Sequence, residues 1–383
     1  MRIDPKELQK KLQRIVSERS PFSSPRHLAE VENYIEKEFK SYGLTVVSDT
    51  FSYRGKSYRN IIGRAGSNAR SPLIIVGAHL DSVEGTPGAD DNASGVAVML
   101  EAARTLAQAK LRSPVLFCAF NLEELNMIGS THFAKRLKAA GAKVDAMISL
   151  EMVGYTDNRP GSQKYPIGLR WFYPEQGNFI AVVGNWNSNS LLKKFSRLLR
   201  QVRGLPVETL AVPGNGSLIP AVRLSDHSPF WDLDYPALMV TDTSFFRNPH
   251  YHGRSDTIET LDLGFRYGRG VSRTRRVELS GGAGAVYTET LDASTRQPRR
   301  FWGPSGYATA RIDLGRTGTL AADYRRAVSV LQGLTAQAFL TDAGSVRLGG
   351  LLTDRMDLVF AGLYSNGQAG GARDALEPGR VES

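Results

Sequence analysis

The chain has 383 residues, of which 41% are hydrophobic and 22% are charged, a balance typical of a globular protein with a sizeable core. No apolar run approaches the roughly 20 residues that a membrane-spanning helix needs, so we predict no transmembrane helix. The net charge of +10 is not gathered in a basic helix or an aromatic-lined groove, and we therefore expect no nucleic-acid partner.

The N-terminal segment MRIDPKELQKKLQRIVSERS is charged and helix-like, and it lacks the apolar core of a signal peptide. We therefore expect a cytoplasmic protein by default. The alternative is a secreted or cell-envelope protein, which applies if the natural start lies further upstream.

Helical and strand patterns alternate as far as about residue 263. Apolar residues at helical spacing predict helices at 26–43, 94–109 and 127–140, and short apolar runs predict strands at 44–51, 59–66, 73–79, 115–120 and 146–154. Strands that alternate with helices favour an α/β fold with a mostly parallel, mixed central sheet flanked by helices. Ligands of such sheets bind at the carboxyl ends of the strands.

The pattern changes after residue 263, where glycines become frequent and apolar residues alternate with a period of two. Five or six strands can be drawn, among them 334–340, 345–352 and 356–364. No lysine follows Lys194, whereas the last 120 residues contain sixteen arginines. We therefore predict two parts, a first domain at 1–263 and a β-rich, Arg-only C-terminal region at 264–383.

The role of the C-terminal region is open. Its alternating segments resemble strands of outer-membrane barrels, but they are too few to close one. We favour soluble or incomplete β-structure, whether native or a fusion, over a fragment that contacts a membrane or the cell envelope.

Ionisable residues follow the predicted strand at 73–79. In the H-x-D pair, His79 could bind a metal while Asp81 hydrogen-bonds the other nitrogen of its ring. This pair alone is a weak signal. The motif GADDNASG then adds Asp90 and Asp91 before a predicted helix. Capping of that helix explains one of these aspartates better than two.

Further carboxylates follow the next two predicted strands. Glu123 and Glu124 are adjacent and repel each other unless a cation or a shared proton intervenes. Glu151 stands in an apolar strand, and buried glutamates are rare unless paired or bound to a metal. A late segment, NPHYHGRSDT, supplies His252.

In this order, the motifs GAHLDS, GADDNASG, NLEELNMIGS, SLEMVGY, LSDHSPFW and TDTSFFRNPHYHGRSDTIETLD resemble those of the co-catalytic di-zinc aminopeptidases. That family includes bacterial leucyl aminopeptidases and aminopeptidase Y. The resemblance covers roughly residues 20–263 and implies a zinc-exopeptidase (phosphorylase/hydrolase-like) fold. It also implies two Zn²⁺ ions, with Co²⁺ or Mn²⁺ as possible substitutes.

The resemblance also assigns roles to single residues. It implies five metal ligands: His79 and Glu151 for one ion, Glu124 and His252 for the other, and Asp90 as the bridge. It implies Glu123 as the general base, Asp81 as the support of the first histidine, and a cis peptide beside Asp91.

The expected function is hydrolysis of the N-terminal peptide bond of peptides with a free N-terminus. One alternative is a carboxypeptidase on the same core, with Arg223 or Arg247 binding the substrate carboxylate. Others are a glutaminyl cyclase-like enzyme with one zinc ion and a non-catalytic, receptor-like module.

Overall fold

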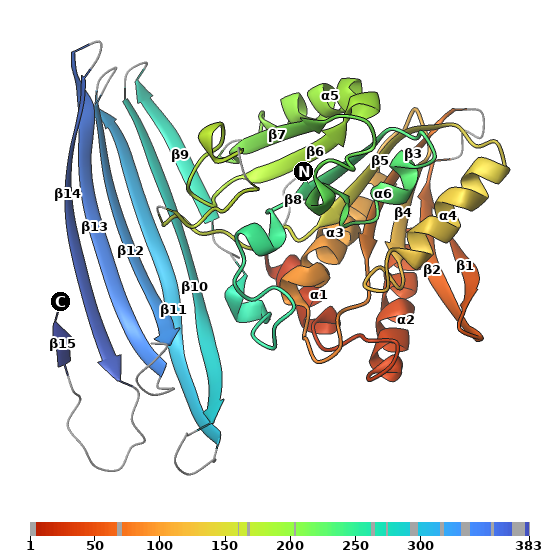
Figure 1. Cartoon of the computed structure of the whole chain (residues 1–383), viewed down its shortest axis with the longest axis horizontal. Coiled ribbons are helices and arrows are strands. Elements are labelled where there is room, and N and C mark those ends of the chain that lie inside the picture. Colours follow the sequence, from red (N-terminus) through yellow and green to blue (C-terminus); the bar gives the residue numbers. More distant parts are fainter. Residues whose placement is uncertain are drawn as a thin grey trace. The chain divides into compact units, whose positions relative to one another are not determined.

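The structure of the chain is a computed structural model, shown in Figure 1. It describes residues 5–382 except 67–70, 160, 167–168, 203, 262–264, 273–274, 292–297, 315–317, 331–337, 354–355 and 370–379. The chain forms two compact units, Met1–Leu261 and Asp262–Ser383, and each is described by itself. The sequence placed the boundary two residues later.

The first unit contains helices, strands and short turns. Its helices are α1 (Pro5–Ile15), α2 (Pro25–Ser41), α3 (Gly95–Ala107), α4 (Ile128–Ala139), α5 (Asn189–Leu199) and α6 (Ser228–Trp231). Its strands are β1 (Thr45–Tyr53), β2 (Lys56–Ala65), β3 (Leu73–His79), β4 (Val115–Phe120), β5 (Val144–Glu151), β6 (Ile180–Asn185), β7 (Val207–Val212) and β8 (Ala237–Thr241). Turns include η1 (Ala89–Ser94) and η2 (Leu169–Trp171).

The eight strands form one mixed sheet in the order β1-β2-β4-β3-β5-β8-β6-β7. The pairs β4–β3, β3–β5, β5–β8 and β6–β7 are parallel, whereas β1–β2, β2–β4 and β8–β6 are antiparallel. The predicted α/β fold with a mostly parallel, mixed sheet flanked by helices is confirmed.

Helices cover both faces of this sheet (Figure 1). Buried side chains of α1, α2, α3 and α5 share one core with one face of the strands. Those of α4 and α6, such as Phe133 and Phe230, form a second core with the opposite face. Since both faces are covered, a central strand such as β4 is apolar throughout and every one of its residues is buried.

The direction of the strands determines which loops meet. The parallel strands β4, β3, β5 and β8 end at the same edge of the sheet, so the segments that follow them lie together. Strands β6 and β7 run the opposite way, because β6 is antiparallel to β8. They therefore begin at the edge where the other four strands end.

The second unit is an antiparallel sheet in the order β15-β14-β13-β12-β11-β10-β9. Its strands are β9 (Phe265–Ser272), β10 (Arg275–Leu291), β11 (Pro298–Leu314), β12 (Gly318–Val330), β13 (Ala338–Thr353), β14 (Met356–Ala369) and β15 (Arg380–Glu382). The sequence predicted five or six strands, and the described residues form seven. Of the predicted strand at 334–340, residues 334–337 lie outside the described residues.

No helix among the described residues combines the length and the apolar character needed to cross a lipid bilayer.

We predict that residues 1–261, produced without the second unit, fold by themselves. All strand partners of β1–β8 lie within this segment, and so do both of its cores. The expected result is a single cooperative thermal transition with the circular dichroism of an α/β protein. An aggregated or unfolded product, when the full chain is folded under the same conditions, would contradict this prediction.

Candidate metal centre

The candidate site lies at the edge of the first sheet where the parallel strands end. His79 is the last residue of β3 and Glu151 is the last residue of β5. Glu123 and Glu124 follow β4, and His252 comes from a loop beyond β8. Strands that run side by side thus bring together residues that are far apart in the sequence.

Two groups of three side chains form around one carboxylate. His79, Asp91 and Glu151 make up the first group, and Asp91, Glu124 and His252 make up the second. The Nε2 atom of His79 lies 3.2 Å from Asp91 Oδ1, and Nε2 of His252 lies 3.2 Å from Asp91 Oδ2. Each oxygen of Asp91 therefore faces a different histidine.

Each group is completed by a glutamate. His79 Nε2 lies 3.4 Å from Glu151 Oε1, and His252 Nε2 lies 3.5 Å from Glu124 Oε2. A hydroxyl of Ser225 donates to the second oxygen of Glu151 at 2.7 Å and so fixes its orientation. Sequence reasoning paired these glutamates with the same histidines.

The prediction that Asp90 bridges the two groups is wrong, because the structure places Asp91 there. The Asp90 carboxylate points elsewhere and accepts hydrogen bonds from the Gly154 amide at 2.9 Å and the Asn248 side chain at 2.7 Å. Both aspartates lie in η1, where the backbone torsions of Asp91 and Asn92 are not helical. Neither helical nor strand periodicity applies in such a turn, so spacing could not tell the two neighbours apart.

The turn that carries Asp91 is held through its backbone. The carboxylate of Asp256 accepts from the Asp90 amide at 2.9 Å and from the Asp91 amide at 3.1 Å. The peptide bond between Asp91 and Asn92 is cis, so the cis peptide lies beside Asp91. The side chain of Asn92 bridges to β5 by donating to the Leu150 carbonyl at 2.8 Å.

Asp81 contacts both the loop after β4 and the ring of His79. Its carboxylate accepts from the amides of Glu123 at 3.1 Å and Glu124 at 3.2 Å, and so positions the loop after β4. Its Oδ1 atom is 3.7 Å from Nδ1 of His79, beside the ring as expected but beyond normal hydrogen-bond length. The contact with the loop was not foreseen from the sequence.

A buried arginine lies behind the loop between β3 and η1. Arg19 is fully buried and donates to five carbonyl oxygens, among them those of Leu80 at 2.8 Å and Gly88 at 2.8 Å. Sequence reasoning missed both Arg19 and Asp256, because both act on backbone atoms and neither belongs to a recognisable ligand pattern.

The electrostatics of the cluster favour bound positive charge. Burial alone would lower the pKa of His252, but its contacts with Asp91 and Glu124 raise it to about 10. Burial and the nearby Asp91 carboxylate raise the pKa of Glu124 to about 7. Burial also raises the pKa of Glu123 well above its usual range, although His79 opposes this shift. Without a cation, these groups keep protons that they would not hold in water.

The donor set fits zinc. Imidazole nitrogens and carboxylate oxygens are ordinary zinc ligands, and each group supplies three of them. The Oε1 atom of Glu124 is buried and has no hydrogen-bond partner among the described residues. A bound cation would satisfy this oxygen.

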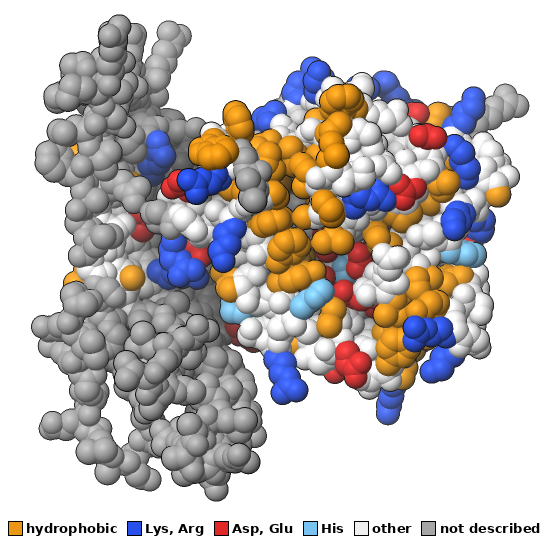
Figure 2. All heavy atoms as spheres, viewed as in Figure 1, with side chains coloured by type: hydrophobic (Ala, Val, Ile, Leu, Met, Phe, Trp, Pro, Cys, Tyr) orange, Lys and Arg blue, Asp and Glu red, His pale blue; other side chains and the backbone are white. Residues whose placement is uncertain are grey.

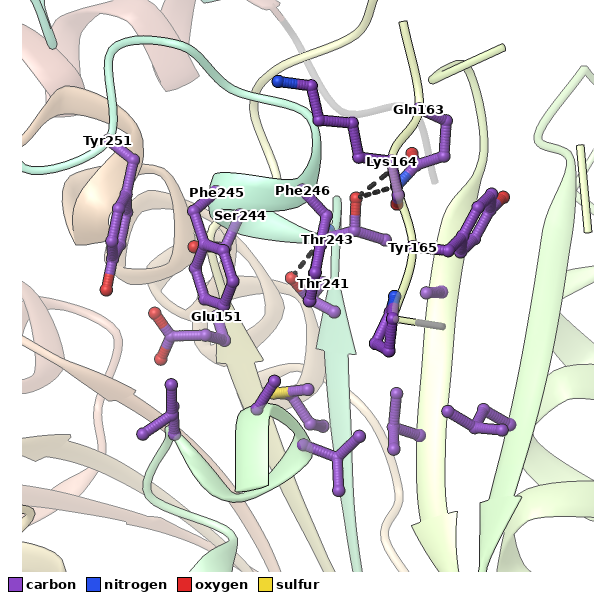
Figure 3. A pocket seen from close by; sticks show the side chains of 18 of the residues that line it. Glu151, Gln163, Lys164, Tyr165, Thr241, Thr243, Ser244, Phe245, Phe246 and Tyr251 are labelled. Carbon is purple, nitrogen blue, oxygen red and sulfur yellow. Dashed lines mark hydrogen bonds between the residues drawn. The ribbon is translucent and has the colours of Figure 1, made fainter. Parts of the chain in front are cut away.

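A cavity of about 380 Å³ opens beside the cluster. Asp91, Glu123, Glu124, Glu151 and His252 lie on its wall. The rest is largely apolar, with Phe179, Val183, Leu210, Met239, Phe245 and Phe246 among the lining residues. Figure 2 shows acidic and histidine side chains in a hollow that hydrophobic side chains border, and Figure 3 shows the cavity from close by.

Comparison with known proteins agrees with this site. Residues 60–266, more than half of the chain, match the model of peptidase family M28. The Escherichia coli protein YfbL is 40% identical over 255 residues, which cover 62% of this chain and 78% of YfbL. Aminopeptidase YwaD of Bacillus subtilis is 32% identical over 216 residues, which cover 55% of this chain and 42% of YwaD.

Other relatives are matched over part of their length. A probable leucine aminopeptidase of Arthroderma otae is 29% identical, with 60% of this chain and 59% of that protein covered. The chain thus spans about half the length of the relatives that are named aminopeptidases. The crystal structure of the LapA aminopeptidase of Legionella pneumophila has the same fold, with a TM-score of 0.55, 23% identity, and 68% of this chain and 66% of LapA covered.

The family match extends from β2 to the start of β9 and includes each of the residues that the structure gathers around Asp91. The chain therefore belongs to peptidase family M28, a family of zinc-dependent exopeptidases.

Proposed function

We propose that this protein is an aminopeptidase that uses two zinc ions to remove the N-terminal residue of peptides. The observation that carries the proposal is the position of Asp91, whose two oxygens face two separate ligand groups. One carboxylate shared by two His-and-Glu groups is suited to hold two divalent ions.

In this proposal the residues have separate roles. His79 and Glu151 would hold one ion, Glu124 and His252 would hold the other, and Asp91 would contribute to both. Bound zinc would supply Lewis acidity, which lowers the pKa of a water molecule and polarises the scissile carbonyl group. Asp81 and Ser225 orient the ligands through the contacts described above.

Glu123 is the proposed general base. It lines the cavity next to the ligands, and its Oε2 atom lies 3.9 Å from His79 Nε2, farther than the carboxylates of Asp91 and Glu151. It would accept the proton of the attacking water and donate it to the leaving amine. The charge of the bound ions would keep its carboxylate ionised before the reaction.

The cavity is suited to a substrate residue bound beside the proposed ligands. Its apolar wall provides room for one large side chain beside the ligands. The two arginines considered for a carboxypeptidase have other partners: Arg247 donates to Gln163 and to two carbonyl oxygens, and Arg223 pairs with Asp232 at 2.7 Å.

Substituting Glu123 by Gln should lower kcat on aminoacyl nitroanilides by about 100- to 10,000-fold, since a general base contributes about that much. The zinc content should not change, because Glu123 is not among the proposed ligands. Metal analysis together with steady-state kinetics checks both results. Glu124→Gln serves as the matched control and should lose zinc, and wild-type turnover by zinc-loaded Glu123→Gln would refute the proposed base.

The neighbouring aspartates should differ in metal binding. Asp91→Asn should retain fewer than two zinc ions per chain, since both groups lose their shared oxygen ligand. Asp90→Asn should still bind two ions, because the Asp90 carboxylate contacts Gly154 and Asn248 rather than a proposed ligand. Calorimetric titration with zinc measures how many ions each variant binds. A weaker effect at position 91 than at position 90 would restore Asp90 as the bridging residue.

Blocked peptides should separate the two exopeptidase activities. A tripeptide with a C-terminal amide should be hydrolysed as fast as the free tripeptide, and one with an N-terminal acetyl group should resist hydrolysis. Mass spectrometry of the products identifies which bond is cleaved. The reverse pattern would favour the carboxypeptidase alternative.

A further inference from the structure

The cavity beside the ligands has a far end that the proposed function does not use. The strand register shows where it lies. Glu151 on β5 is aligned with Thr241 on β8, Thr241 with Ala181 on β6, and Ala181 with Glu208 on β7. All four of these residues line the cavity.

These four residues form one row across the sheet, with a carboxylate at each end. Three strand spacings of about 4.8 Å place the backbones of Glu151 and Glu208 about 14 Å apart. The two residues between them, Thr241 and Ala181, have short side chains and leave the row open. In Figure 3, Thr241 lies between Glu151 and Tyr165, so the far end of the cavity is the end at Tyr165.

Two tyrosines accompany Glu208 at the far end. The rings of Tyr165 and Tyr173 stack with their centroids 5.8 Å apart, and both line the cavity. Their hydroxyls are held in place, since Tyr165 donates to the Pro174 carbonyl at 2.6 Å and Tyr173 donates to the Thr209 carbonyl at 2.9 Å. Thr209 directly follows Glu208 in β7, so this bond holds Tyr173 beside the acid, and burial and the Glu208 carboxylate raise the pKa of Tyr173.

Glu208 forms no hydrogen bond and no ion pair with a described side chain. Burial raises its pKa, and the charge of Arg200, which donates to the Val207 carbonyl at 3.3 Å, opposes this shift without reversing it. Lys164 is the one lysine or arginine among the described residues of the cavity wall, and in Figure 3 its side chain leads away from Tyr165. A half-buried carboxylate beside two aromatic rings is a favourable environment for a cation.

We propose that Glu208, with Tyr165 and Tyr173, forms a subsite that binds the positively charged end of a lysine or arginine side chain at the N-terminus of the substrate. This inference rests on the proposed function, because the amino end of the substrate must lie at the metal ligands. A lysine side chain has a flexible four-carbon stem that fits along an apolar wall and carries its charge to the far end. A shorter apolar side chain would fill only the part of the row nearest Glu151.

The test compares lysine with norleucine, whose side chain has a similar length and no charge. Wild-type protein should have a higher kcat/KM for lysyl than for norleucyl nitroanilide above neutral pH. Glu208→Gln should reduce this ratio about ten-fold, and Glu208→Lys should bring it below one. Glu175→Gln, which neutralises an exposed acid on the neighbouring loop outside the cavity wall, should leave the ratio unchanged.

A binding measurement separates this inference from the proposed function. Calorimetry with lysinamide and norleucinamide uses zinc-loaded Glu123→Gln protein, because an active aminopeptidase would hydrolyse these amides. This protein should bind lysinamide more tightly than norleucinamide, by a margin that adding Glu208→Gln removes. Equal affinities, or a ratio unaffected by the substitution, would overturn the subsite whether or not the protein is active. Absence of turnover on every free-amino substrate, with the preference for lysinamide intact, would overturn only the aminopeptidase proposal.

Discussion

The rest of the site depends on where the carboxylate of Asp91 points. Its two oxygens lie 3.2 Å from two histidines that are far apart in the sequence, one at the end of β3 and one beyond β8. A buried carboxylate is costly unless it is paired, so its contacts must be maintained by the surrounding structure. Asp256 fixes the turn through two backbone amides, and Asn92 attaches it to β5.

Negative charge is concentrated around that carboxylate and little positive charge faces it. Three carboxylates and two imidazoles make up the two overlapping groups, and the nearby buried cation, Arg19, is already occupied by five carbonyl oxygens. Burial, together with neighbouring carboxylates, raises the pKa values of Glu123 and Glu124. Divalent ions relieve this repulsion, so metal binding and the stability of this edge of the sheet are expected to depend on each other.

Most of the sheet and of the candidate metal cluster could be predicted from sequence, because residues such as His79 and Glu151 end apolar strands whose pattern is local. Sequence could not decide between Asp90 and Asp91, because side chains in an irregular turn do not point in regular directions. Asp256 and Arg19 act on backbone atoms, and a sequence shows no pattern for such contacts. The alignment of Glu208 with Glu151 depends on pairing among four strands, which is not a local property.

The reversal of β6 and β7 relative to β8 has a consequence for how substrate preference changes during evolution. In this half of the sheet the cavity floor consists of paired strand residues, whose spacing is fixed by backbone hydrogen bonds. A larger side chain at one position, such as that of Ala181 on β6, would block the cavity at that strand. The length of the cavity would then shorten by whole strand spacings. A relative with a larger residue there would have a shallower cavity, with no alteration of the loops that carry the proposed metal ligands.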